Sequence, residues 1–441
     1  MPNPAQHSKP SFGTFGARPQ SALMLICALV LLGTTGQAQT FSVLYNFTGG
    51  ADGGRPYAGV TLDRSGNLYG TAWLGGNQSC NLGGDNGCGT VFKVSRRGTG
   101  WTFDLLYSFS GGADGWWPLA PVTVGSDGTV FGTTNYGGST GCFAGEGCGT
   151  VFQLHPPPTF CRSVLCPWTK TQVYEFTGGL DGGAPLASLT FDAAGNIYST
   201  TSYAQGNQYY GSVYELSPSN HGWTITVLHT FTDYAEGGGS EAGVVFDQQG
   251  NLWGSTLLGG ADDCYDPQLP DPCGILFELT PSGTGWNYRS AYQFQQSVGG
   301  GPTGALIFDQ SGNLYGTLFI NGASGNGGVY QYNPFSGQET TIYSVAGYPD
   351  SPYGPQGGVL MDSAGNLYGV DPYDGPYSWG YVFKLSPSNG GWTFTDLHDF
   401  TGGSDGAAPF CTLAVDENGN IYGTTNLGGA HGQGAVFKIT P

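Results

Sequence analysis

A chain of 441 residues with 80 glycines, 14% aromatic residues and only 10% charged residues is too aromatic to be disordered and too often interrupted by glycine to be helical. Glycine-rich turns between short aromatic and β-branched runs instead predict an all-β protein. The formal net charge of −19 argues against a nucleic-acid partner and against docking on anionic lipids, because both need a basic surface.

Residues 1–38 have the features of a signal peptide. Basic residues without acidic ones precede an apolar run at 22–32, and small residues at 36–38 form a candidate cleavage site. Removing this segment takes away Lys9 and Arg18, so ten basic residues remain against 31 acidic ones, a net charge of −21. No later apolar run is long enough to span a bilayer. We therefore expect a secreted protein, extracellular or periplasmic, with a single mature domain at 39–441 and no transmembrane segment.

One motif, Asp-x-x-Gly-Asn-Leu-Tyr-Gly-Thr, is first seen at 63–71 and occurs seven times with variations. Around each copy lie four strand-like runs, which in the third unit are 187–192, 196–201, 211–216 and 223–231. Four short antiparallel strands per repeat, seven times over, predict a seven-bladed β-propeller. The repeats are about 59 residues apart, measured between the turn glycines Gly66, Gly128, Gly195, Gly250, Gly312, Gly365 and Gly419.

The two ends of the mature chain predict how the ring closes. A lone run of the fourth type, residues 40–47, opens the domain, and a run of the third type, 435–439, ends it. We expect the N-terminal strand to complete the last blade, because closure leaves no unfinished sheet. The repeated aspartate is expected to form the turn between the first two strands of each blade, at Asp63, Asp192, Asp247, Asp309, Asp362 and Asp416.

Eight cysteines lie in close pairs, which predicts four local disulfides formed in an oxidising compartment. Cys411 is left over in an apolar run and is expected to be a small buried residue. No Cys-x-x-Cys spacing occurs, which excludes the usual zinc arrangement. The expected pairs are Cys80–Cys88, Cys142–Cys148, Cys161–Cys166 and Cys264–Cys273.

Antiparallel order places the long connections on one face of the ring, which we call the loop face. Long loops on a rigid scaffold are where binding residues tend to lie. Flat aromatic side chains beside polar loops suit sugar rings or an extended partner. The alternative is that these rings only close the mouth of the channel. The candidate binding residues are Trp73, Trp116, Trp117, Tyr209, Tyr210, Tyr377 and Trp379.

The Gly-Gly-x-Asp-Gly segments offer a candidate metal site. Their carboxylates lie among glycine carbonyls in equivalent connections, which suits a hard cation such as calcium. The alternative is a turn that the aspartate fixes by hydrogen bonding. No other cofactor is expected, and no set of His, Ser, Cys and Asp residues converges in one unit, so no catalytic residue is predicted. The four carboxylates belong to Asp52, Asp114, Asp181 and Asp405.

The motifs LYxFTGGxDGxxP, DxxGNLYGTT and GGxxGxGxVFKLxPSGxGW together resemble the GloVer (Gloeobacter/Verrucomicrobia-type) tandem repeat over nearly the whole mature chain. The resemblance implies an exported, β-rich repeat protein and supplies no catalytic residue. Several members of that family carry a carboxy-terminal sorting anchor of the choice-of-anchor type. This sequence ends at Pro441 directly after a strand, without a recognisable anchor.

Three functions follow as hypotheses. The first is a non-catalytic, monomeric binding module for a glycan or an extracellular protein. The second is an exported enzyme of the lactonase or polysaccharide lyase kind, since propellers host such sites. The third is a structural envelope or matrix component. Converging acids or histidines would favour an enzyme, and an exposed aromatic patch would favour a binder.

Overall fold

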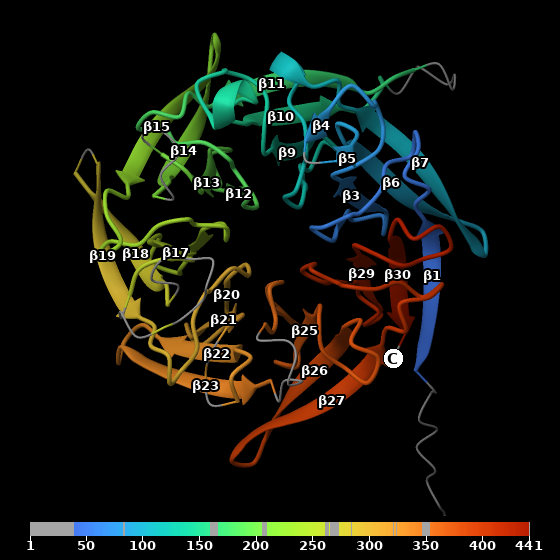
Figure 1. Ribbon diagram of the computed structural model, residues 1–441. Coiled ribbons are helices and arrows are strands. Elements are labelled where there is room, and N and C mark those ends of the chain that lie inside the picture. The colour runs from blue at the N-terminus through green and yellow to red at the C-terminus, as the bar shows by residue number, and fades with distance from the viewer. Residues whose placement is uncertain are drawn as a thin grey trace, which may run out of the picture. The chain divides into compact units, whose positions relative to one another are not determined.

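The computed structural model describes residues 39–82, 84–158, 166–204, 210–260, 264, 273–283, 285–320, 322, 324–345 and 353–440. Seven four-stranded antiparallel sheets stand around a ring, which confirms the predicted seven-bladed β-propeller (Figure 1). No α-helix occurs within these ranges. Two single-turn 3₁₀ helices, η1 (Gly112–Asp114) and η2 (Phe143–Gly145), and a small ribbon of β4 (Asn81–Leu82) and β5 (Asp85–Asn86) lie in the connections.

Each blade has four strands, and blades 1 to 7 are numbered in chain order. The inner strands are β2 (Val60–Leu62), β8 (Thr123–Val124), β12 (Thr190–Phe191), β16 (Val245–Phe246), β20 (Ile307–Phe308), β24 (Leu360–Met361) and β28 (Ala414–Val415). The second strands are β3 (Leu68–Ala72), β9 (Val130–Thr134), β13 (Ile197–Thr201), β17 (Leu252–Thr256), β21 (Leu314–Leu318), β25 (Leu367–Asp371) and β29 (Ile421–Thr425). The third strands are β6 (Thr90–Arg97), β10 (Thr150–His155), β14 (Ser212–Ser219), β18 (Ile275–Ser282), β22 (Gly328–Asn333), β26 (Tyr381–Ser388) and β30 (Ala435–Thr440). The outer strands are β7 (Gly100–Ser108), β11 (Thr169–Glu175), β15 (Gly222–Thr230), β19 (Gly285–Gln293), β23 (Gln338–Ser344), β27 (Gly391–Asp399) and, in blade 7, β1 (Thr40–Asn46).

The ring closes as the sequence predicts. Strand β1 pairs antiparallel with β30, from Thr40 opposite Thr440 to Asn46 opposite Ala435, and completes the sheet β1-β30-β29-β28. In Figure 1 the blue N-terminal strand lies against the red strands of the last blade. The two ends of the domain are therefore held in one sheet, so opening the ring requires breaking that sheet.

The third strand of each blade is buried on both faces because blades pack against each other on either side. Its alternation of Val or Leu with Phe or Tyr fills both interfaces. In blade 1, for example, Val91 and Phe92 are both fully buried. The ring of Phe92 also needs the glycine of the neighbouring strand, because a Cβ at Gly70 would lie 2.6 Å from its Cζ.

The repeated aspartate forms the turn between the first two strands, as predicted. Asp192 accepts hydrogen bonds from the amides of Ala194 and Asn196, the side-chain amide of Asn196 and the Tyr198 hydroxyl. Burial tends to raise the pKa of Asp192, but these hydrogen bonds, chiefly from Asn196, lower it below its ordinary value. Equivalent hydrogen bonds are accepted by Asp63, Asp247, Asp309, Asp362 and Asp416.

The inner strands are shorter than the sequence suggests. In blade 3 the expected run of 187–192 forms a strand only at Thr190–Phe191. Nearer the channel, side chains of one blade donate hydrogen bonds to the backbone of the next blade. The Thr190 hydroxyl donates to the Val244 carbonyl, and the Thr123 hydroxyl donates to the Leu189 carbonyl. These bonds hold neighbouring blades together where the strands crowd the axis.

Three of the predicted disulfides are present, Cys80–Cys88, Cys142–Cys148 and Cys264–Cys273. Cys411 is free and buried, as expected. The fourth expected pair includes Cys161, which lies outside the described residues, as do the expected signal peptide at 1–38 and Tyr209. Within the described ranges, no helix has the length and hydropathy needed to cross a membrane.

Candidate functional site

Seven equivalent side chains, one from each blade, face the central channel just before the inner strands. The residue before each of them and the residue after it are buried, whereas all seven are partly exposed. The preceding residue is proline in six blades and the following residue is always small, but the channel-facing residue varies. We call these seven residues the variable ring: Tyr57, Leu119, Leu186, Glu241, Thr303, Gln356 and Phe410.

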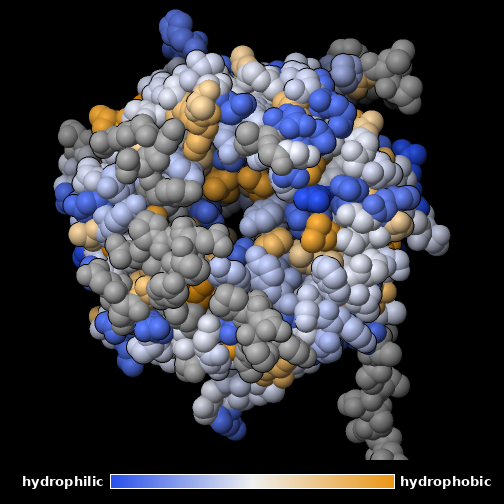
Figure 2. Space-filling view, in the orientation of Figure 1, coloured by the Kyte–Doolittle hydropathy of each residue, from blue (hydrophilic) through white to orange (hydrophobic). Residues whose placement is uncertain are grey.

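The variable ring surrounds a cavity of about 480 Å³ at the centre of the propeller. Figure 2 shows a hollow at this place on the loop face, with hydrophobic groups beside it. Small residues further along the inner strands, such as Gly243 and Gly358, also line the cavity and leave it wide. The volume falls within the range of small-molecule sites, roughly 300 to 1,000 Å³.

Among the described residues that line the cavity, Glu241 is the only acidic or basic one. Its carboxyl group lies among aromatic and aliphatic walls, and desolvation raises its pKa to about 7. No described cation pairs with it. A carboxyl group in this state holds or releases a proton near neutral pH, and it offers a ligand one strong hydrogen-bonding group.

On one side of the cavity the rings of Tyr57 and Phe410 stack with their centroids 4.8 Å apart and their planes 15° apart. The Tyr57 hydroxyl donates to Oε1 of Gln356 at 3.4 Å. Burial, and to a smaller extent the nearby Glu241 charge, raise the pKa of Tyr57. This side therefore presents flat aromatic surface next to a carboxamide.

Trp73 and Trp117 also line the cavity. Their rings meet edge to face, with centroids 4.9 Å apart. The Trp117 indole nitrogen donates to the Gly87 carbonyl, but the Trp73 indole nitrogen is buried without a partner among the described residues. The side-chain oxygen of Asn135, which also lines the cavity, is buried and has no described partner either. Such groups are costly to bury unsatisfied, and a bound ligand would relieve that cost.

The structure separates the other aromatic candidates from the cavity. Trp116 is 3% exposed and packs behind Trp117 against Tyr136. Tyr210 packs against Tyr234. Tyr377 and Trp379 are 56% and 45% exposed, but neither lines the cavity. Their part in binding stays a prediction.

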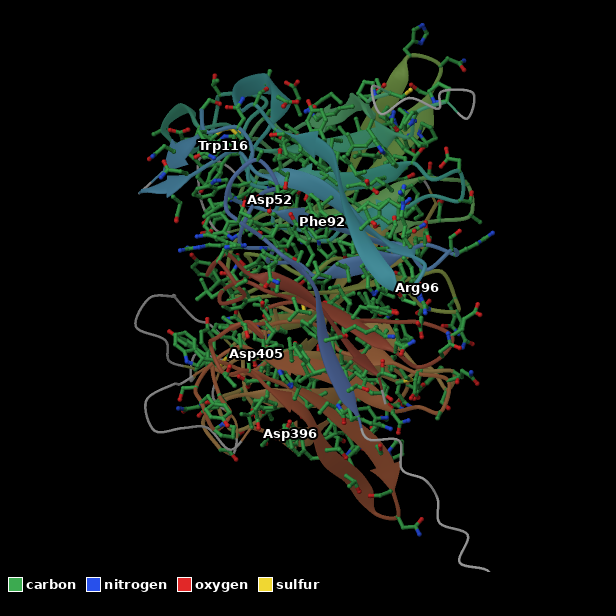
Figure 3. The ribbon with its side chains drawn as sticks, turned by 90° about the vertical axis from the view of Figure 1, so that its right-hand side faces the viewer. Asp52, Phe92, Arg96, Trp116, Asp396 and Asp405 are labelled. Atoms are coloured by element: carbon green, nitrogen blue, oxygen red, sulfur yellow. A yellow bond between two sulfur atoms is a disulfide. The ribbon has the colours of Figure 1, made fainter. Side chains whose placement is uncertain are left out.

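Of the four candidate metal carboxylates, Asp52 and Asp405 lie on the side opposite Arg96 (Figure 3). Asp181 accepts hydrogen bonds from the Thr177 amide and hydroxyl and from the Tyr174 hydroxyl. Asp52 and Asp405 are held by the corresponding threonines, and Asp114 by a serine and by Lys170 at 2.9 Å. Among the described residues no group of three His, Cys, Asp or Glu side chains could hold a metal ion. The calcium hypothesis stays a prediction.

Two histidines replace the tyrosine of this same hydrogen-bonding pair. His398 lies 3.3 Å from Asp405, and His229 lies 3.7 Å from Glu236, which takes the place of the aspartate in blade 4. Burial lowers the pKa of His398, although the Asp405 charge opposes the shift. Both histidines are thus parts of the loop framework and do not reach the cavity.

Sequence reasoning missed Glu241, Gln356, Tyr57 and Phe410. The signal that points to them is the position after the repeated proline, because it differs widely in size and polarity between units, while the residue before it is proline in six units and the residue after it is always small. Asn135 follows the second strand of blade 2 and carries no comparable signal.

The model of the Gloeobacter/Verrucomicrobia repeat family matches residues 30–266 and 266–441. The chain belongs to this family. The family description names a repeat and no activity, so it adds nothing to the chemistry of the cavity. None of the curated proteins matches the chain.

Three solved structures resemble the chain at low identity and with TM-scores below 0.5. A putative 6-phosphogluconolactonase from Bacteroides fragilis is 18% identical, with a TM-score of 0.47 over 83% of this chain and 87% of that one. A putative 6-phosphogluconolactonase from Bacteroides uniformis is 13% identical, with a TM-score of 0.45 over 77% and 83%. A putative oxidoreductase (glucose dehydrogenase) from Thermus thermophilus is 15% identical, with a TM-score of 0.39 over 73% and 96%. These likenesses carry no activity over to this chain.

Proposed function

We propose that this protein is an exported, non-catalytic propeller that binds the end of a neutral glycan in the loop-face mouth of its channel. The observation that carries the proposal is the variable ring. A scaffold that repeats the same turn and strand residues in every blade changes its side chains where they face one shared cavity. Packing alone would be served by one residue type repeated seven times, whereas an asymmetric ligand needs different contacts on each side.

The chemistry of the cavity suits a sugar. Aromatic faces such as that of Phe410 stack on the apolar side of a sugar ring, while Gln356, Glu241 and Asn135 are placed to orient its hydroxyl groups. The net charge of −19 and the Glu241 carboxyl group disfavour glycans that carry carboxylates or sulfates. A neutral glycan is therefore the better fit.

Export is supported by the three local disulfides, which form and persist in an oxidising compartment. Together with the expected signal peptide at 1–38, they point to a place outside the cytoplasm, where glycans are displayed on surfaces or released.

A glycan screen of the disulfide-intact protein, with and without calcium, tests the proposal. We expect binding to neutral glycans, and a loss of at least tenfold in the Tyr57→Leu and Gln356→Ala variants, which change the cavity wall. Trp379→Ala is the matched control, because Trp379 is exposed on the same face but outside the cavity. Absence of binding to any neutral glycan, or a loss in the Trp379 variant alone, would refute the cavity as the site. An effect of calcium on affinity would support metal binding at the loop aspartates.

Glu241 favours an enzyme of the lactonase or polysaccharide lyase kind as the second candidate. A pKa raised to about 7 by burial suits a general acid or base at neutral pH. The assays are hydrolysis of sugar lactones, followed by release of acid, and cleavage of uronate-containing glycans, followed by formation of unsaturated products. Turnover that Glu241→Gln abolishes while binding persists would establish the enzyme, and binding without turnover would exclude it.

A further inference from the structure

Two neighbouring blades each place one unpaired polar side chain in the wall of the central cavity. Trp73 follows the second strand of blade 1 and Asn135 follows the second strand of blade 2, so they hold equivalent positions in the repeat. The indole nitrogen of Trp73 and the side-chain oxygen of Asn135 are buried and have no hydrogen-bond partner among the described residues. One group is a donor and the other an acceptor, and both residues line the cavity.

Other blades show how a polar side chain at this position is satisfied. In blade 3 the Ser202 hydroxyl donates to the Ser240 carbonyl at 2.9 Å. In blade 7 the Asn426 carboxamide donates to the Arg55 carbonyl at 3.4 Å. Asn135 is only 9% exposed, yet its carboxamide makes no hydrogen bond to a described residue. Blade 2 thus departs from the pattern of its own repeat.

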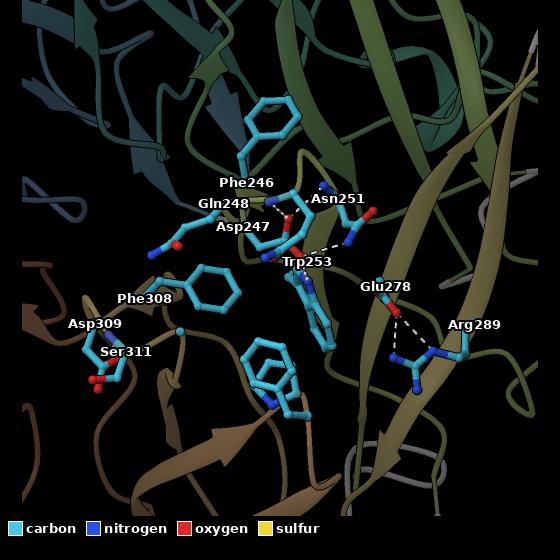
Figure 4. A pocket seen from close by; sticks show the side chains of 14 residues that line it. Phe246, Asp247, Gln248, Asn251, Trp253, Glu278, Arg289, Phe308, Asp309 and Ser311 are labelled. Carbon is cyan, nitrogen blue, oxygen red and sulfur yellow. Dashed lines mark hydrogen bonds and ion pairs between the residues drawn. The ribbon is translucent and has the colours of Figure 1, made fainter.

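Two other tryptophans show how a buried indole nitrogen is paired in this propeller. Trp117 donates to the Gly87 carbonyl at 3.2 Å. Trp253, which lines a second cavity between blades 4 and 5 (Figure 4), donates to Asp247 at 3.1 Å. The Trp73 N–H has no such acceptor among the described residues. An unpaired buried donor costs free energy that a ligand with an acceptor in the cavity would recover.

Trp117 contacts both residues that carry the unpaired groups. Its ring meets the Trp73 ring edge to face with centroids 4.9 Å apart, and its carbonyl accepts a hydrogen bond from the Asn135 backbone amide at 3.0 Å. Trp73 and Asn135 therefore belong to one part of the cavity wall, and aromatic surface lies beside them. This part of the wall offers a neutral donor, a neutral acceptor and aromatic rings, which suits an uncharged group with both hydrogen-bonding roles.

We propose that this part of the cavity binds the acetamido group of an N-acetylated sugar. The carbonyl oxygen of a secondary amide accepts a hydrogen bond from the Trp73 indole, and its N–H donates to the Asn135 oxygen. The acetamido methyl group packs on the rings of Trp73 and Trp117, a surface that a hydroxyl group leaves uncovered. The inference rests on the proposed glycan function and narrows it to one class of neutral sugar.

The first test measures the binding of two neutral trisaccharides to the disulfide-intact protein by calorimetry. Triacetylchitotriose and cellotriose share one backbone and differ only in an acetamido or a hydroxyl group on the second carbon of each ring. We expect triacetylchitotriose to bind at least tenfold more tightly, because only its acetamido group satisfies both side chains and covers the rings. Equal affinity, or a preference for cellotriose, would overturn this inference and leave the glycan function in place.

Failure of both trisaccharides to bind would also overturn the inference, whereas the glycan function would fall only if no neutral glycan of the screen bound. A third probe, N-acetyl-trialanine amide, presents secondary amides without a sugar. If this peptide bound as tightly as triacetylchitotriose, the assignment of the amide to a sugar would be overturned. All three measurements use the unaltered protein, so they decide the inference even where a variant does not fold.

The second test changes the two polar groups. Trp73→Phe keeps an aromatic ring but removes the indole N–H, and Asn135→Leu removes the carboxamide at similar size. Each variant should reduce the preference for triacetylchitotriose over cellotriose to below threefold. Asn426→Leu is the matched control and should keep the preference, because the Asn426 carboxamide holds the equivalent position but already donates to a backbone carbonyl. A preference that survives in both variants, or that the control loses equally, would overturn the inference.

Discussion

Replacing Glu241 by glutamine should stabilise the protein at alkaline pH. Burial raises the pKa of Glu241 from 4.5 to about 7, so the folded protein binds this proton more tightly than the unfolded chain does. The stability that comes from the protonated group is fully present below pH 4.5 and is lost as the pH rises through 7. Glutamine has nearly the same shape and stays neutral, so its contribution does not change with pH.

The magnitude follows from the size of the shift. One pKa unit corresponds to about 1.4 kcal/mol, so a rise from 4.5 to about 7 is equivalent to about 3 kcal/mol. Glu241 is partly exposed to the open channel, where water screens its charge, so we expect a gain of about 2 kcal/mol for Glu241→Gln at pH 8.

The assay is urea unfolding at pH 4, 6 and 8. The difference in unfolding free energy between Glu241→Gln and the unaltered protein should be close to zero at pH 4 and should grow to its full value at pH 8. Burial also raises the pKa of Asp371 and Glu339, but these groups titrate in both proteins and cancel in the difference. Glu417→Gln, in an exposed turn, is the control and should show no trend. A difference that is constant with pH, or a less stable variant at pH 8, would refute the desolvation of Glu241.

Three further predictions concern the fold. Phe47→Ala, at the end of the ring-closing strand, should lower the unfolding free energy by about 3 to 5 kcal/mol. Phe400→Ala, at the equivalent end of β27, should lower it by the same amount. A much smaller effect of Phe47→Ala in urea unfolding would contradict closure by β1. Asp192→Ala should lower the unfolding free energy by about 2 kcal/mol at pH 7. Hydrogen bonds lower the pKa of Asp192 against the effect of burial, so this loss should shrink as the pH falls through the lowered pKa. A loss that persists at pH 2 would argue against a role for the charge. Reduction of the disulfides should lower the melting temperature, by the equivalent of about 2 to 3 kcal/mol for each loop on the chain-entropy model. Cys411 should react with a thiol reagent only on unfolding. Labelling of Cys411 in the native protein would contradict its burial.

Much of the fold follows from residues that are close in sequence. The turn at Asp192 is made by residues within six positions of it, and the disulfide Cys142–Cys148 spans six. The period of the repeat gives the number of blades, and the lone outer strand at Thr40–Asn46 gives the closure. These features depend on local hydrogen bonds or on the number and order of the repeated strands, and both can be predicted from the sequence.

The candidate sites depend on contacts between blades, which the repeat does not specify. Tyr57 and Gln356 are 299 residues apart in sequence and meet only because the ring brings blades 1 and 6 to one channel. Among the loop tryptophans the sequence shows no difference, yet Trp116 is buried and Trp379 is exposed because only Trp116 has aromatic neighbours on both sides. The sequence by itself thus determined the blade, its repetition and the closure of the ring, since local bonds form them. The tertiary structure alone decided which side chains share a cavity, because a ring of seven blades joins residues that are distant along the chain.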